Sequence, residues 1–127
     1  MHFHRGGVDP SAPGAGRIEG CVVEDDPGWA YVNHSSHVDF IENVSYNVVG
    51  GAFQTESGDE IGSFIRNLAI RTVNPDPPIL TPETEPVDLR EDSQDVAFQG
   101  DGIWFHGGAL VVEGNIAQGE RVVPNWP

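Results

Sequence analysis

The sequence predicts an all-β protein, a right-handed parallel β-helix (a solenoid) of about five coils with one long loop excursion. The first observation behind this prediction is a repeated frame, in which a short apolar run meets a glycine or asparagine turn residue. The turn residues of the four copies are Gly20, Asn43, Asn67 and Asn115, at spacings of 23, 24 and 48 positions. Because 48 is twice 24, one period fits all four copies, as in a protein of stacked repeats.

The second observation is the composition. The chain has 127 residues, of which 16 are glycine and 10 are proline. No stretch of ten or more residues carries an apolar period of 3.6, so short strands joined by turns are favoured over helices. The length suits a single domain, residues 1–127. Because the sequence begins inside what is expected to be a strand, we expect it to be a fragment of a longer protein.

The third observation is a set of aromatic residues in short strands that the period makes equivalent. They are Phe3, Tyr31, Phe53 and Phe105. On stacked strands such residues are expected to form an inward ladder, while their neighbours point outward. The repeated asparagines have a matching logic, since an amide at a turn can bond to the identical amide one coil away.

The individual strands follow from runs of β-forming residues between turn signals. Strands are expected over residues 2–5, 17–24, 29–33, 38–41, 44–46, 52–55, 63–66, 68–73, 96–98, 103–106 and 110–116. Turn chemistry separates them, as where Pro27 fixes φ and Gly28 is free to take a positive φ.

Two segments depart from this pattern. Residues 74–95 combine five prolines with many acidic residues. Such a segment can neither join a ladder nor bury much apolar area, so it is expected to be an acidic, proline-rich loop insertion. Residues 120–127 are expected to form a tail.

The charge excludes some partners. The formal net charge is −14, from 20 acidic residues and 6 arginines, with no lysine. Nucleic acid is not expected as a partner, because phosphate binding requires clustered cations. The longest apolar runs are only a few residues, so no membrane insertion is expected either. A salt-adapted or calcium-rich setting and an ordinary acidic protein from a GC-rich genome both remain open.

Several motifs come in an order that suggests a family. They are His2-Phe-His4-Arg-Gly-Gly, Val32-Asn-His34-Ser-Ser-His37, Asn43-Val-Ser-Tyr46, Gly51-Ala-Phe-Gln-Thr-Glu56-Ser-Gly-Asp59, Arg66-Asn67-Leu-Ala-Ile, Gly102-Ile-Trp-Phe and Gly114-Asn115-Ile-Ala-Gln-Gly119. The chain thereby resembles the parallel β-helix region of the cell-migration-inducing, hyaluronan-binding proteins and their bacterial secreted homologues.

The resemblance implies a right-handed parallel β-helix, an extracellular or cell-surface location, and binding or depolymerisation of hyaluronan with calcium. The chain departs from the family at Ser57, where the family usually has a second acidic residue. A net charge of −14 also disfavours a polyanion such as hyaluronan and affects the broader expectation, a polysaccharide that is hyaluronan-like or another glycan, less.

A divalent metal site is expected from histidines and carboxylates on neighbouring coils. His2 and His4 are two positions apart in a predicted strand, so both imidazoles project to one face. Glu56 and Asp59 follow on a later coil, and coils about 5 Å apart can bring such side chains together. We therefore expect His2, His4, Glu56 and Asp59 to bind calcium or zinc.

Carbohydrate chemistry at the same face is the second expectation. In it, His4, His34 and Glu56 supply the base and the acid for cleavage of a polysaccharide. A competing interpretation is that the histidines only stack in a solvent-facing ladder.

Substrate binding is expected from three further residues: Arg66, Trp104 and His106. Arginine can grip a sugar carboxylate, and tryptophan can stack on a sugar ring. A plain ion pair for the arginine and partial burial for the tryptophan are the structural alternatives.

The sequence therefore favours an extracellular, metal-assisted protein acting on a polysaccharide, with hydrolase or lyase activity as open alternatives. A non-catalytic glycan-binding or adhesive module and a self-assembling structural β-solenoid are the rival expectations. The end coils of a short solenoid have open edges, so capping by neighbouring domains or by homo-oligomerisation is also expected.

Overall fold

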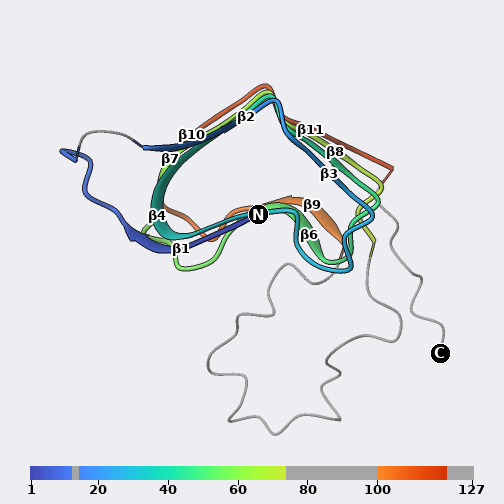
Figure 1. Ribbon diagram of the computed structural model, residues 1–127, viewed down its shortest axis with the longest axis horizontal. Helices are drawn as coiled ribbons and strands as arrows, with labels where there is room; N and C mark the ends of the chain where they lie inside the picture. The colour runs from blue at the N-terminus through green and yellow to red at the C-terminus, as the bar shows by residue number, and fades with distance from the viewer. Residues whose placement is uncertain (13–14, 74–99, 120–127) are drawn as a thin grey trace, which may run out of the picture.

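A computed structural model describes residues 1–12, 15–73 and 100–119, and these residues form an all-β structure without a helix (Figure 1). The predicted loop at 74–95, the predicted strand at 96–98 and the predicted tail at 120–127 lie outside the described residues. Within the described ranges, no helix is long and apolar enough to cross a membrane.

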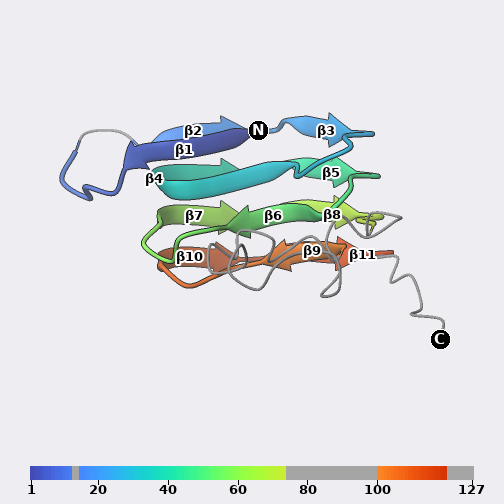
Figure 2. The same cartoon turned by 90° about the horizontal axis from the view of Figure 1, so that it is seen from below.

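The strands stack as four levels, which Figure 2 shows edge-on. The first level holds β1 (His2–Gly7), β2 (Gly16–Glu19) and β3 (Val22–Glu24), and the second holds the long β4 (Tyr31–Ile41) and β5 (Val44–Tyr46). The third holds β6 (Gly51–Thr55), β7 (Ile61–Ile65) and β8 (Leu68–Ile70), and the fourth holds β9 (Asp101–Trp104), β10 (Ala109–Glu113) and β11 (Ile116–Gln118).

These strands form two sheets in which every pairing is parallel. The larger sheet has the order β10-β7-β4-β6-β9, with β1 and β2 also pairing with β4, and it curls strongly around the bend in β4. The smaller sheet has the order β11-β8-β5-β3. In it Val44 pairs with Leu68 and Leu68 with Ile116, so the predicted spacings of 24 and 48 are confirmed.

The core lies between the sheets and is fullest in the middle levels. Tyr31 and Phe53 stack with ring centroids 4.7 Å apart and planes 1° apart, and Phe40 packs on Phe64 at 4.9 Å. All four rings are almost fully buried. Burial of this apolar area is what holds successive levels together, because each level covers its neighbour.

The predicted aromatic ladder is correct for one pair of neighbours and wrong for its two ends. Tyr31 is in register with Phe53, but Phe53 is in register with Ile103, and Phe3 is in register with Asn33. Phe3 packs instead on Phe40 at 6.0 Å. The reason is that every second residue of a strand faces inward. An aromatic residue two positions further along the strand therefore still points into the core.

Phe105 is the other misplaced end of that ladder. Its ring lies 4.7 Å from the ring of Phe64, on the neighbouring part of the core. Both ends of the predicted ladder thus contribute to the core through partners other than the ones predicted.

An asparagine ladder, made of Asn43, Asn67 and Asn115, closes one corner of the stack. Asn43 Nδ2 donates to Asn67 Oδ1 at 3.0 Å, and Asn67 Nδ2 donates to Asn115 Oδ1 at 2.9 Å. The backbone N–H groups of Asn43 and Asn67 donate to the same oxygens. The predicted amide-to-amide bonding is therefore confirmed.

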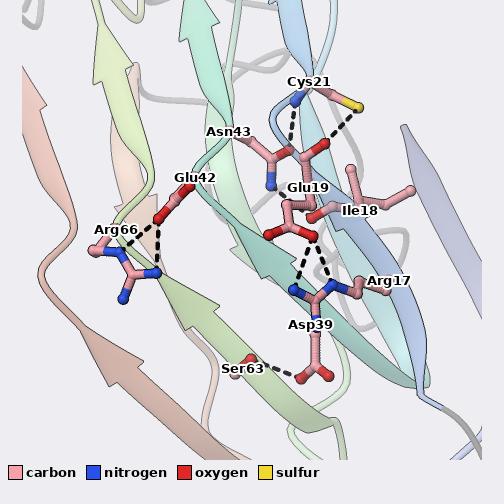
Figure 3. Close-up of polar contacts among 9 residues, drawn as sticks. All are labelled: Arg17, Ile18, Glu19, Cys21, Asp39, Glu42, Asn43, Ser63 and Arg66. Carbon is pink, nitrogen blue, oxygen red and sulfur yellow. Dashed lines mark hydrogen bonds and ion pairs between the residues drawn. The ribbon is translucent and has the colours of Figure 1, made fainter.

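The first level joins this ladder through Cys21 rather than through Gly20 as predicted. Cys21 N–H donates to Asn43 Oδ1 at 3.0 Å, and Asn43 Nδ2 donates to the Ile18 carbonyl (Figure 3). Gly20 stands one position earlier, where the other levels place a left-handed residue. These residues and their φ angles are Gly20 (64°), Glu42 (54°), Arg66 (52°) and Gly114 (64°). The two kinds of turn position are adjacent at this corner, so the predicted alignment was displaced by one residue.

Candidate metal centre

The register of the larger sheet stacks four polar residues on its outer face, one from each level. His4 pairs with His34. Asn33 pairs with Thr55, and Glu56 N–H donates to the Asn33 carbonyl at 3.2 Å, so Glu56 follows in line with His34. His106 closes the series on the fourth level. We call these four residues, His4, His34, Glu56 and His106, the histidine–glutamate column.

Glu56 gathers two imidazoles of this face around its carboxylate. Its Oε2 forms an ion-pair contact with His34 Nδ1 and lies 3.5 Å from His2 Nε2. One ligand atom from each of the three residues lies within 4.8 Å of the others. The side chains of His34 and Glu56 are 7% and 9% exposed, and that of His2 is 41% exposed. The group is thus anchored on the inside and open on one side.

The histidine rings pack against one another. The ring of His34 lies 4.4 Å from that of His4 and 6.0 Å from that of His2, which it stacks at 25°. His2 and His4 are 5.5 Å apart, as expected for residues on the same face of one strand. His4 therefore flanks the group, although its ligand atoms are not among the three that converge.

Burial lowers the pKa of His2 from its ordinary value of 6.5, against the carboxylate of Glu56, which raises it. The neighbouring histidines His4 and His34 and the N-terminal amine lower the pKa further. At neutral pH the His2 imidazole is therefore neutral. A neutral imidazole is the form that binds a metal, since the nitrogen lone pair must be free.

A buried carboxylate outside the column holds the chain that carries this group. Glu60 is fully buried and accepts hydrogen bonds from four backbone N–H groups. The donors are Ser35 (3.3 Å), Glu56 (3.1 Å), Ser57 (2.6 Å) and Gly58 (2.8 Å). Glu60 thus ties the residue after His34 to the turn that begins at Glu56.

Sequence reasoning missed this role of Glu60, which lies between the strands predicted at 52–55 and 63–66. A usable signal was present, because the turn Ser57-Gly58-Asp59-Glu60 offers several backbone donors and needs an acceptor nearby.

The donor set discriminates between the two metals expected from the sequence. Two imidazole nitrogens and one carboxylate oxygen suit zinc or a similar transition ion. Calcium instead takes about six to eight oxygen ligands. Of the two metals, the residues present fit zinc better than calcium.

The other predicted site residues do not all lie at this group. Trp104 and His106 lie on the fourth level below Glu56, with ring centroids 5.4 Å apart, and His106 Nδ1 lies 2.7 Å from the Glu56 carbonyl oxygen. Asp59 is exposed and lies outside the group of converging ligand atoms. His37, further along β4, lines a separate cavity of about 240 Å³.

Arg66 lies away from the column, at the corner between β7 and β8 beside the asparagine ladder. Its guanidinium donates twice to Glu42 Oε1, at 2.7 Å and 2.9 Å, and both side chains are exposed (Figure 3). The ion pair that the sequence offered as the alternative for this arginine is therefore present, and its role in substrate binding stays a prediction.

Comparison with known proteins adds no relative: no family model, no curated protein and no solved structure matches the chain.

Proposed function

We propose that the chain is a right-handed parallel β-helix that acts on a polysaccharide outside the cell, with a zinc ion held by His2, His34 and Glu56. Each level corresponds to one coil, and the described residues support four of the about five coils expected. The uniformly parallel pairing at repeated spacings supports this architecture. The extracellular location rests on the family resemblance.

The single observation that carries the proposal is the convergence of these three side chains, whose ligand atoms lie within 4.8 Å. Three protein ligands with one open position are typical of catalytic rather than structural zinc. When bound, zinc would activate a water molecule or polarise a sugar oxygen. His4, whose ring packs on His34 at the exposed rim, would then exchange a proton with the substrate.

The arrangement suits a polymer, because the column crosses all four levels at steps of about 4.8 Å. A polysaccharide can lie along this strip and contact several levels at once. The converging group contains a single carboxylate, Glu56, while Asp59 is exposed and Glu60 is occupied by backbone donors. Metal-assisted cleavage therefore fits better than hydrolysis by a pair of carboxylates.

The test is product formation from a polysaccharide panel by the zinc-loaded chain. The proposal predicts new reducing ends or unsaturated products, abolished by a chelator and by His34→Ala. The matched control is His37→Ala, which removes a histidine of the same strand that is not in the column and should leave activity unchanged. Equal activity of the chelated protein, or equal loss in both variants, would contradict a zinc centre at His34.

Saturable glycan binding without any product would instead identify the non-catalytic glycan-binding module. This outcome would keep the polymer-binding face and remove the catalytic role of the metal.

The structural alternative has its own supporting observation. The fourth level leaves Val111, Val112 and Ile116 between 51% and 58% exposed, and within the described residues β10 and β11 are the last strands of their sheets. Such an edge can pair with another domain or with a second copy. Defined multimers in sedimentation experiments, with neither glycan binding nor metal binding, would favour that role.

A further inference from the structure

The corner of the first level contains a cavity that the proposed function does not use. β1 ends opposite Ser36 of β4, and β2 begins opposite Val38. Residues 8–15 are therefore inserted opposite a single residue of β4, His37, and the chain leaves the stacked strands there (Figure 1). The cavity beside this insertion has a volume of about 240 Å³. It shares no residue with the group of His2, His34 and Glu56.

Part of the cavity lining is apolar and continuous with the core. It includes Phe3, whose ring packs on Phe40, and Val38, which is 1% exposed. Gly16 leaves space between these two side chains, because a Cβ there would lie 3.2 Å from Phe3 Cε1 and 3.5 Å from Val38 Cγ2. An apolar cavity of about 150 Å³ can hold benzene. This cavity therefore has room for one ring with a short substituent.

Asp9 is the one acidic residue among the described residues that line the cavity. The hydroxyl and the backbone N–H of Ser11 both donate to Asp9 Oδ1, at 2.6 Å and 2.8 Å, so Oδ2 has no hydrogen bond within the described residues. The hydroxyl bond and then the backbone bond lower the pKa of Asp9 from its ordinary value of 3.8, so the group is ionised at neutral pH. The Ser36 hydroxyl, in contrast, already accepts from Gly6 N–H and donates to the His34 carbonyl.

We infer that this cavity binds a small organic ammonium ion, with its apolar ring against Phe3 and Val38 and its ammonium group at Asp9. An ammonium group can donate to the free Oδ2, and an aromatic ring attracts a nearby cation. A chain with a net charge of −14 also attracts cations and repels anions. The inference goes beyond the proposed function and does not depend on it, because the two sites share no residue.

The test is an NMR titration with three probes of similar shape and different charge: benzylammonium, benzyl alcohol and benzoate. Salt at about 0.15 M screens attraction by distant charges. Asp9→Asn keeps the shape of the side chain and removes its charge. Its matched control is Asp26→Asn, because Asp26 also precedes a proline and accepts the N–H two residues further on, from Gly28 at 2.9 Å, but does not line the cavity.

The inference predicts that benzylammonium binds about five- to tenfold more tightly than benzyl alcohol and that benzoate does not bind. Asp9→Asn should weaken benzylammonium binding about five- to tenfold, and Asp26→Asn should leave it unchanged. Ala12→Leu, which enlarges an exposed residue of the lining, should weaken binding of both benzylammonium and benzyl alcohol.

Equal affinity for benzylammonium and benzyl alcohol, or no binding of either probe, would overturn the inference. Equal losses in the two aspartate variants, or full binding by Ala12→Leu, would overturn it as well. The same titration on chelator-treated protein separates this inference from the proposed function. Benzylammonium binding should be unchanged there, and its loss on removal of zinc would contradict two separate sites.

Discussion

The asparagine ladder and the histidine–glutamate column are both stacks of polar residues repeated once per level, but only the first satisfies itself. In the ladder, the side-chain oxygens of Asn67 and Asn115 each accept two hydrogen bonds from the level above. In the column, imidazoles and a carboxylate crowd together, and Glu56 is shared by His34 and by His2, which lies beside the column. A stack that closes on itself is structural, whereas one that concentrates metal-binding groups at a partly open surface is a candidate site.

The largest expected effect tests the structural half of this comparison. Asn67→Ala removes the acceptor of two donors of Asn43 and the donor to the Phe40 carbonyl, deep in the structure. We expect the free energy of unfolding to fall by about 3 kcal/mol in urea denaturation, with unchanged zinc affinity in the folded protein. The control Ser11→Ala breaks one exposed side-chain bond, to Asp9, and should cost about 0.5 kcal/mol. Similar costs for both variants would show that the ladder is not a structural element.

The next effect concerns Glu60, which combines features of the ladder and of the column. Its carboxylate is satisfied by backbone hydrogen bonds, as the ladder amides are by theirs, and these bonds support the column. Glu60→Gln places an amide group against a backbone donor, so we expect about 2 kcal/mol of lost stability. Zinc affinity should also fall by about 10- to 100-fold, since the ligands lose their support. Asp59→Asn, at the exposed neighbouring carboxylate, is the matched control. Equal zinc loss in the control would instead give Asp59 a direct role as ligand.

A smaller effect concerns how the stability of the buried core depends on pH. Tyr31 donates its hydroxyl hydrogen to carbonyls of Cys21 (2.9 Å) and Val44 (3.1 Å), and burial raises its pKa to about 12. The unfolded chain ionises near the ordinary value of 10.0. The contribution of the neutral Tyr31 hydroxyl to the free energy of unfolding is therefore complete below pH 10 and is lost as pH rises toward 12.

Tyr31→Phe should cost about 1 kcal/mol at pH 7 and flatten the decline of stability above pH 10. Melting curves taken across that range measure both effects. The control Tyr46→Phe changes an exposed tyrosine and should keep the wild-type slope. A slope that persists in Tyr31→Phe would place the alkaline titration elsewhere.

The smallest effect concerns the exposed corner. Arg66→Gln removes the ion pair with Glu42, for which we expect less than about 0.5 kcal/mol because both groups are solvated. Glycan binding should be unchanged, because Arg66 lies beside the ladder and not beside the column. Weakened polysaccharide binding in this variant would instead support Arg66 as a substrate-binding residue.

The sequence was sufficient for the repeat because identical turn residues stack in parallel strands. Asn43, Asn67 and Asn115 carry the period on their own, and the structure confirms their mutual bonding. It was insufficient for the first level, where Cys21 instead of Gly20 meets Asn43. The left-handed turn position and the ladder position are adjacent in the sequence. Residue type alone therefore does not show which of the two positions a glycine or asparagine occupies.

The candidate site was predicted in part. His2, His34 and Glu56 were all singled out, but the predicted ligand set contained His4 and Asp59 and assigned His34 to catalysis. The offset between the first two levels is 30 residues at His2 and Val32, and between the next two it is 22 at Val32 and Gln54. These offsets depend on the lengths of the loops between levels, which cannot be predicted from the sequence. The residues that lie beside Glu56 are therefore known only from the strand register.

The most direct test of the central claim is the zinc content of the purified chain after loading and dialysis, read beside its thermal melt. The account predicts one zinc ion per chain in the wild type, a higher melting temperature with zinc than with chelator, and loss of both in Glu56→Gln. A wild-type protein that retains no zinc and melts at the same temperature with zinc and with chelator would contradict it.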